Sequence, residues 1–569
     1  MKRLTKSLLC LLLVILMLGG CGSPSPSGSD DQTQSTPADS TPVDPTNEAT
    51  EPTEDPAIAM QALEDRIASY QQLGTSPDDN YRTWYEIFVY SYCDSNSDGI
   101  GDLNGVRSKL DELQALGVTG IWLMPIHPSL SYHKYDVKDY FDIDPQYGTM
   151  KDFEALIADC NDRGIKVILD LVVNHTATQH EWFQITHEYL KGLEEGQEAS
   201  AEDCEYFDFY NFSKEKLAGY SHLSGTDYYY ECQFSNGMPD LNLANEALRE
   251  EIMKIMRYWI KKGVAGFRVD AAKEFYTGEV EKNVEVLNWL QETATSLKED
   301  VYMVAEVWDD LSTVTKYYKS GFTSIFNYPF GNNGGKIITT IRNMDNPNLI
   351  PTYAQALESV HADYAGNHPG YIDAPFLSNH DVGRIYGFAS GDEVKIKLAG
   401  AMNVLMSGSV FVYYGEEIGM PGSGNDPSKR APMFWNQLRN DGTTNPPPAC
   451  TLQECVYGSL EDQKNDPYSI YNYYREVIAI RNALPVISHG VPTVEAALNT
   501  GCISAHRKTW EDQECIIIMN IASQAAQVDL SAYADWSMVA GVSADGEPIT
   551  MEGTTLNISA CGIAILLPN

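Results

Sequence analysis

The chain has 569 residues, too many for one ordinary domain, and its 43% hydrophobic and 21% charged residues exclude a low-complexity or fibrous protein. Its formal net charge of −40 argues against nucleic acid and anionic lipid headgroups as partners. A neutral ligand would be indifferent to that charge.

The N-terminus is typical of an exported protein. Three basic residues precede an apolar run, Leu8 to Leu18, that is too short to span a bilayer comfortably. The run leads into Gly19-Gly20-Cys21, which resembles the lipobox of bacterial lipoproteins. The resemblance implies that residues 1–20 are a signal peptide and that a lipid on Cys21 anchors the mature chain at the extracellular face of the cell membrane. The alternative is a plain secretory signal.

A linker is predicted after Cys21. Residues 22–57 contain seven prolines and eight acidic residues but no Lys, Arg or aromatic residue. Such a composition cannot bury enough apolar surface to fold, so we expect residues 21–57 to be disordered. The pattern from Ile58 to Leu73 predicts a short amphipathic helix that leads into the folded part.

From Tyr81 onward, apolar strand-like runs alternate with helical segments. Continuous apolar runs between helices indicate a buried parallel sheet, and eight such units predict a (β/α)8 barrel over residues 58–176 and 241–484. An open doubly wound sheet is the alternative, disfavoured because no Gly-rich phosphate loop follows the first strand. The eight predicted strands are Trp84–Tyr90, Val118–Met124, Ile165–Val172, Val264–Val269, Tyr302–Glu306, Ser324–Tyr328, Ala374–Leu377 and Val410–Tyr414.

Two further domains are predicted around the barrel. About a hundred residues separate the third and fourth predicted strands, against roughly thirty in a typical barrel unit, so residues 177–240 form an inserted domain. Short alternating strands over residues 485–569 predict a C-terminal antiparallel β-sandwich. Proximity along the chain suggests the disulfide pairs Cys204–Cys232, Cys450–Cys455 and Cys502–Cys515, although spacing does not fix connectivity.

Acidic residues follow several of the predicted strands. Arg268 and Asp270 are two apart, so they face the same side of a strand, and the guanidinium would favour an ionised carboxylate. A structural ion pair is the alternative for this pair. Glu306 lies one barrel unit later and Asp381 two units beyond that, so all three acids should meet at the carboxyl end of the barrel.

Two carboxyl groups on adjacent strands suit one reaction in particular. Adjacent strands lie about 4.8 Å apart, close to the roughly 5–5.5 Å that retaining glycosidases require between nucleophile and acid. His175 and His380, also at strand ends, suit binding of hydroxyl groups near a developing charge. The sequence therefore predicts cleavage of glycosidic bonds.

The strand-end motifs together resemble the signature regions of glycoside hydrolase family 13, the α-amylase family, over residues 81–569 in the right order. The motifs are Asp170-Leu-Val-Val-Asn-His175, Gly266-Phe-Arg-Val-Asp270-Ala-Ala-Lys273, Val304-Ala-Glu306-Val-Trp308, Phe376-Leu-Ser-Asn-His380-Asp381, Met238-Pro-Asp-Leu-Asn242 and Gly415-Glu-Glu-Ile-Gly419. The resemblance implies that Asp270 is the nucleophile, Glu306 the acid/base and Asp381 the stabiliser of the transition state. It further implies substrate-binding roles for His133, Tyr135, Asp136, His175, Arg268, Lys273 and His380.

Two positions depart from the family pattern. Glu274 stands where many amylases have His. The resemblance therefore does not fix the subsite on the leaving-group side or the pattern of products. Met238 opens a motif that looks intermediate between oligo-1,6-glucosidases and neopullulanases.

A loop near the start of the barrel predicts a structural Ca²⁺ site. Asp94, Asn96, Asp98 and Asp102 place oxygen ligands at alternate positions, with the carbonyl of Ile100 as a further ligand. A solvated turn is the alternative.

The resulting hypothesis is a retaining α-glucan hydrolase acting on the α-1,4 bonds of starch or malto-oligosaccharides. An α-glucosidase, a cyclomaltodextrinase or neopullulanase-like hydrolase, or a transglycosylase would use the same residues. A non-catalytic glucan-binding lipoprotein is the remote alternative.

Overall fold

The computed structural model describes residues 55–569. Cys21, the signal peptide and nearly all of the predicted linker lie outside the described residues. Helix α1 (Pro56–Tyr70) begins two residues before the predicted helix because Asp55 caps its N-terminus and proline occupies its first turn. Arg66 joins α1 to Glu476 of α16 (Ile470–Ala483) at 2.7 Å. Within the described range, no helix combines the length and apolar character that crossing a bilayer requires.

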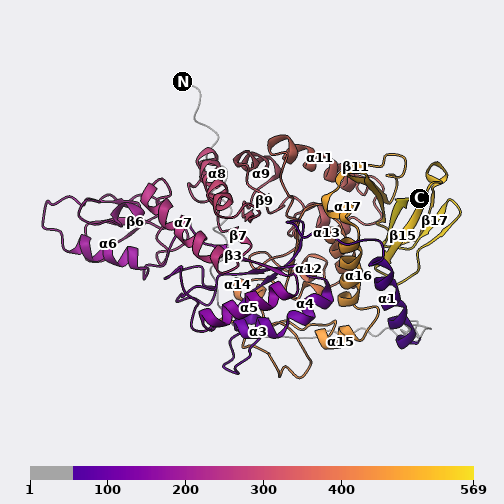
Figure 1. Ribbon diagram of the computed structural model, residues 1–569, viewed down its shortest axis with the longest axis horizontal. Helices are drawn as coiled ribbons and strands as arrows, with labels where there is room; N and C mark the ends of the chain where they lie inside the picture. The colour runs from indigo at the N-terminus through magenta and orange to yellow at the C-terminus, as the bar shows by residue number, and fades with distance from the viewer. Residues whose placement is uncertain (1–54) are drawn as a thin grey trace, which may run out of the picture. The chain divides into compact units, whose positions relative to one another are not determined.

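The predicted barrel is present (Figure 1). Its strands are parallel and run in the order β10-β1-β2-β3-β7-β8-β9. The predicted seventh strand is reduced to two parallel bridges, Phe326 to Ala374 and Phe376 to Phe411, which close the sheet between β9 and β10. Pro375 lies between these bridges and lacks an N–H group, which limits regular pairing there. The strands are β1 (Thr83–Ile87), β2 (Gly120–Leu123), β3 (Lys166–Leu171), β7 (Gly266–Val269), β8 (Tyr302–Ala305), β9 (Ser324–Ile325) and β10 (Val410–Tyr413).

Aromatic side chains fill the barrel interior. Trp84 stacks on Tyr302 with ring centroids 5.1 Å apart, and Trp122 lies 5.5 Å from Phe326. Gly120 has no room for a side chain, because an added Cβ would lie 2.2 Å from the Trp84 ring. The interior is therefore a packed core, and ligands are confined to the ends of the strands.

Helices surround the sheet, with short helices in the loops between them. Local capping sets several of their ends; Thr149 and Asp152 form a capping box at the start of α5. The remaining helices of this region are α2 (Val89–Tyr92), α3 (Leu103–Ser108), α4 (Leu110–Leu116), α5 (Met150–Asp162), α7 (Glu246–Lys261), α8 (Val280–Leu297), α9 (Leu311–Tyr317), η2 (Tyr318–Ser320), α10 (Lys336–Arg342), α11 (Thr352–Asn367), α12 (Ile385–Phe388), α13 (Glu393–Val404), η3 (Glu416–Ile418), α14 (Asp426–Lys429), α15 (Leu460–Lys464) and α17 (Pro485–His489).

The segment between β3 and α7 forms the small inserted domain. It contains α6 (Glu181–Lys191) and a three-stranded sheet in the order β4-β6-β5. A bridge from His175 to Asp240 ties it to the segment after β3, and a bridge from Tyr210 to Leu241 ties it to the segment that leads into α7. In Figure 1, α6 and β6 project to the left of the barrel region marked by β3 and β7, with α7 between them. The strands are β4 (Phe212–Ser213), β5 (Tyr220–His222) and β6 (Tyr229–Glu231).

The C-terminal residues form two antiparallel sheets. One has the order β11-β12-β13-β18-β15 and the other β14-β17-β16. None of the nine cysteines in the described range is in a disulfide, so the three pairs suggested by proximity are not formed. The strands are β11 (Val491–Val494), β12 (Ile503–Trp510), β13 (Gln513–Asn520), β14 (Ala526–Asp529), β15 (Trp536–Ser543), β16 (Thr550–Glu552), β17 (Thr555–Ile558) and β18 (Gly562–Pro568).

Candidate active site

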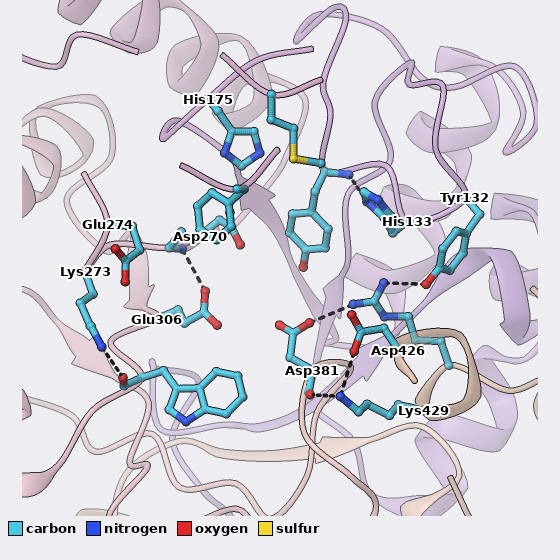
Figure 2. A pocket seen from close by; sticks show the side chains of 16 residues that line it. Tyr132, His133, His175, Asp270, Lys273, Glu274, Glu306, Asp381, Asp426 and Lys429 are labelled. Atoms are coloured by element: carbon cyan, nitrogen blue, oxygen red, sulfur yellow. Dashed lines mark hydrogen bonds and ion pairs between the residues drawn. The ribbon is translucent and has the colours of Figure 1, made fainter. Parts of the chain in front are cut away.

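The three predicted acids lie around one cavity of about 740 Å³ at the carboxyl end of the barrel (Figure 2). Asp270 and Glu306 directly follow β7 and β8, whose last residues pair with each other in the parallel register. The acids therefore lie side by side, at roughly the 4.8 Å spacing of adjacent strands. Asp381 reaches the cavity from the loop after the seventh strand. The cavity is lined by Tyr132, His133, Tyr135, His175, Phe234, Met238, Asp270, Ala271, Lys273, Glu274, Glu306, Trp308, Asp381, Asp426, Lys429 and Arg430.

Arg268 lies beneath the cavity and holds three carboxylates together. Its Nη1 is 2.5 Å from both Asp170 and Asp270, and its Nη2 is 2.9 Å from Glu306. Burial raises the pKa of Asp270 to about 7, against the opposing charge of Arg268. The sequence predicted that this arginine would keep Asp270 ionised. In the structure a single positive charge is shared among three acids, so its effect on any one of them is smaller.

Glu306 is held by the backbone beside Asp270. The N–H of Ala271 donates to its Oε2 at 2.9 Å, and the hydroxyl of Tyr328 lies 3.3 Å from its Oε1. Ala271 adopts the left-handed conformation with φ of 48°, which is rare for a residue with a side chain. This backbone strain at the residue after Asp270 directs an N–H group toward the neighbouring acid.

Asp381 is held between two cationic side chains. Its Oδ2 lies 2.8 Å from Nε2 of His380, and its Oδ1 accepts from Nη2 of Arg430 at 2.9 Å. Burial alone would raise the pKa of Asp381, but His380 and Arg430 outweigh it and hold this pKa well below its usual range. The contacts with His380 and Arg430 therefore favour the ionised form of Asp381 at the cavity.

Tyr135 presents its ring to the cavity above His380. The two rings are stacked at a centroid distance of 5.5 Å, and the Tyr135 hydroxyl lies 2.7 Å from Nε2 of His380. The opposite ring face suits stacking on a sugar. His175 also lines the cavity; its Nε2 has no hydrogen-bond partner among residues 55–569, and burial lowers its pKa to about 4. A neutral imidazole with an unpaired nitrogen suits a hydroxyl group of a ligand.

The other predicted binding residues lie at different depths. His133 and Lys273 line the cavity, whereas Arg268 and His380 are fully buried behind it. Asp136 is not among the residues that line the cavity, and one oxygen of its carboxylate accepts hydrogen bonds from Ser129, at 2.5 Å, and from Ser131. The contact of Asp136 with a ligand stays a prediction.

Several lining residues were not identified from the sequence. Phe234 of the inserted domain and Trp308 after β8 expose about half of their surface, 51% and 48%. Trp308 stacks on Tyr328 at 5.5 Å, which orients its ring. Arg430 follows α14 and had no motif to mark it. The one available signal was for Trp308, which ends the Glu306 motif but was given no role.

In the predicted calcium loop, the side-chain oxygens that could bind a cation accept hydrogen bonds from the backbone of the same loop. Asp94, Asn96 and Asp98 each accept hydrogen bonds from N–H groups of the loop, and Asp102 caps α3. Among residues 55–569, no three acidic, histidine or cysteine side chains gather as an ion site. A cation here would also need the amide oxygen of Asn96 and the carbonyl of Ile100, and such a set of hard oxygen donors fits Ca²⁺.

A parallel barrel with neighbouring carboxylates at its strand ends is an arrangement that suits a retaining glycoside hydrolase. The chain belongs to the α-amylase family, whose catalytic-domain model matches residues 86–490. It is 40% identical over 443 residues to "Alpha-amylase 3" of Dictyoglomus thermophilum, covering 77% of this chain and 84% of that protein.

Two further comparisons show the range of the family. The structure of Eubacterium rectale Amy13B superposes with a TM-score of 0.85 at 42% identity, covering 89% of this chain and 99% of that one. A "4-alpha-glucanotransferase" of Thermotoga neapolitana is 31% identical over 373 residues, 62% of this chain and 76% of that protein. Relatives thus include both named amylases and a named transferase.

Proposed function

We propose that this protein is a retaining α-glucan hydrolase that cleaves α-1,4 bonds of starch and malto-oligosaccharides. The observation that carries the proposal is the placement of Asp270 and Glu306 side by side after β7 and β8, both in contact with Arg268. The spacing of adjacent strand ends favours direct attack over attack by an intervening water, which needs a wider gap.

The reaction would proceed in two displacements. In the first, Asp270 attacks the anomeric carbon while Glu306 gives its proton to the departing oxygen, so that the glycosidic bond breaks and a glycosyl ester forms on Asp270. In the second, Glu306 takes a proton from water, whose oxygen attacks the same carbon and releases Asp270. Both acids then regain their starting protonation states.

The neighbouring residues would stabilise the positively charged transition state. Asp381 supplies a fixed negative charge, because His380 and Arg430 keep it ionised. The Tyr135 ring lies on the same side of the cavity and offers its face to the sugar. Lys273, whose Nζ is 3.1 Å from the Trp308 carbonyl, would reach the leaving-group side together with Trp308.

Assays on several substrates distinguish the proposed α-1,4 hydrolysis from α-1,6 hydrolysis and from transglycosylation. We expect malto-oligosaccharides from starch and slower or no release of glucose from isomaltose. Starch, pullulan, cyclodextrin and isomaltose would be incubated separately and the products resolved by chromatography. Products longer than a malto-oligosaccharide substrate would instead identify a transglycosylase, as the name of the Thermotoga neapolitana relative suggests for that protein. Cleavage of isomaltose without cleavage of starch would contradict the α-1,4 assignment.

A Ca²⁺ ion in the loop 94–102 would stabilise the fold without joining the reaction. The loop packs against residue 445, whose backbone N–H donates to the carbonyl of Gly99 at 2.7 Å, so the ion would secure a contact between distant segments. We expect a chelator to lower the melting temperature by several degrees, about 2–4 °C per kcal/mol in a large domain. Readdition of Ca²⁺ but not Mg²⁺ should restore it. A melting temperature that does not respond to chelation would contradict the proposal.

The proposed location is the extracellular face of the membrane, through a lipid on Cys21. The support is the Gly19-Gly20-Cys21 sequence after an apolar run. In a bacterial host, Cys21→Ser should move the protein from the membrane fraction to the soluble fraction. An unchanged distribution would contradict the lipid anchor.

A further inference from the structure

Glu86 is a carboxylate inside the barrel that the reaction described above does not use. It lies on β1, is 1% exposed, and faces the loop after the seventh strand. Its Oε1 is 2.6 Å from Nδ1 of His380, a residue 294 positions away in the chain. Burying a carboxylate is costly unless it is paired, and His380 is its partner.

His380 lies between two carboxylates. Nδ1 contacts Glu86, while Nε2 is 2.8 Å from Asp381 and 2.7 Å from the Tyr135 hydroxyl. The imidazole is fully buried, so water cannot replace either contact. A neutral imidazole could donate to only one of the two carboxylates, whereas an imidazolium donates to both. The titratable and charged groups around His380 are Glu86, Tyr135, Asp170, Arg268, Asp381 and Arg430.

We propose that Glu86 is a positioning residue, which holds His380 as an imidazolium oriented toward Asp381 and thereby keeps Asp381 ionised and in place at the cavity. The inference rests on the proposed function, because Asp381 is taken as the group that stabilises the transition state. Glu86 itself does not line the cavity and acts only through His380.

The balance of charges supports this arrangement. Burial would lower the pKa of His380, but Asp381 and Glu86 raise it to about 9. Loss of the Glu86 charge would leave Asp381 as the one carboxylate in contact with the ring. The pKa of His380 should then fall, and deprotonation of His380 would remove one of the two cations that hold Asp381.

The protonation of His380 also decides what Tyr135 can do. An imidazolium carries one hydrogen on Nε2, and the Asp381 carboxylate and the Tyr135 oxygen both lie beside it, at 2.8 and 2.7 Å. That nitrogen cannot accept a proton, so the Tyr135 O–H stays free to donate elsewhere. A neutral His380 that carries its proton on Nδ1 would instead accept the Tyr135 proton at Nε2. Through His380, Glu86 thus influences the hydrogen bonds of Tyr135 and Asp381, both of which line the cavity.

The test compares Glu86→Gln with a matched control, Glu417→Gln. Glu417 is also a buried carboxylate, 2% exposed, but it accepts from the Tyr85 hydroxyl at 2.7 Å rather than from a histidine. Histidine side chains labelled with ¹³C would be titrated by NMR, with the His380 signal assigned as the one lost in His380→Asn. The ratio of kcat/KM between variant and wild type would be measured across pH, because the ratio cancels ionisations that the two proteins share.

We expect the wild-type His380 signal to stay protonated until about pH 9. In Glu86→Gln the midpoint should fall by at least about one unit, and the kcat/KM ratio should fall about tenfold between roughly pH 6 and 9. Glu417→Gln should change neither. A wild-type His380 that titrates below about pH 7 would overturn the proposal even if Glu86→Gln did not fold.

Other outcomes separate this inference from the proposed function. If Glu86→Gln folds, loses activity equally at every pH and leaves the His380 midpoint unchanged, Glu86 has only a structural role and the positioning proposal fails. If Asp270→Asn, assayed beside it, retains activity on malto-oligosaccharides, the proposed function fails instead.

Discussion

Asp270→Asn is expected to lower kcat on malto-oligosaccharides by at least about 10⁴-fold while leaving the protein folded. An amide of the same shape cannot attack the anomeric carbon, so no glycosyl ester can form. The substitution keeps an oxygen that can accept from Arg268, which lies 2.5 Å from Asp270 in the structure. It also removes one of three negative charges that share this arginine, so stability should change little. Initial rates and the melting temperature would be measured together.

The control for this variant is Asp373→Asn. Asp373 is another buried aspartate, hydrogen-bonded by Asn327 at 2.9 Å, and burial raises its pKa to about 7, as it does for Asp270. It precedes the seventh strand, at the opposite end of the barrel from the cavity. We expect Asp373→Asn to retain near-normal turnover once folded. Near-normal turnover in Asp270→Asn would show that Asp270 is not the nucleophile.

Glu306→Gln is expected to show a loss that depends on the leaving group. An amide cannot donate the proton that a departing sugar hydroxyl requires, so kcat/KM on malto-oligosaccharides should fall about 10²–10⁴-fold or more. Fluoride departs from a glycosyl fluoride without that proton, so formation of the ester on Asp270 from this substrate should be much less affected. Azide, which needs no general base, should then restore turnover and give a glycosyl azide.

Glu274→Gln is the matched variant for this experiment. Glu274 also lines the cavity, but its carboxylate accepts from Thr277 at 3.0 Å and makes no contact with Arg268. Its substitution should affect both kinds of substrate to a similar, smaller extent and should not respond to azide. If Glu306→Gln lost activity equally on glycosyl fluoride and malto-oligosaccharide, with no rescue by azide, Glu306 would not be the acid/base.

The parts of the fold that follow from local pattern were predictable from the sequence. Apolar runs between helices identified the barrel strands because both faces of a parallel sheet are buried. Asp270, Glu306 and Asp381 directly follow such runs, and one-unit and two-unit spacing placed them at a common end. The apolar sequence of the seventh strand predicted a regular strand, whereas Pro375 limits its pairing to single bridges.

The partners of these acids could not be read from the sequence. Glu86 looks like an interior residue of a strand, and its contact with His380 spans 294 positions. Arg430 lies 49 positions from Asp381, in a loop without a recognisable pattern. The hydrogen bonds from Ser129 and Ser131 to Asp136 likewise had no signal in the sequence. Side-chain contacts made by folding together distant loops leave no periodic signal.

The stereochemistry of the product tests most directly whether Asp270 and Glu306 act as a close pair. Malto-oligosaccharide would be hydrolysed at high enzyme concentration in deuterated buffer, and the anomeric protons would be followed by NMR before mutarotation equilibrates them. Two displacements at one carbon preserve configuration, so the α-anomer should appear first. If the β-anomer appeared first, water would have attacked directly and the paired arrangement proposed for the two acids would be wrong.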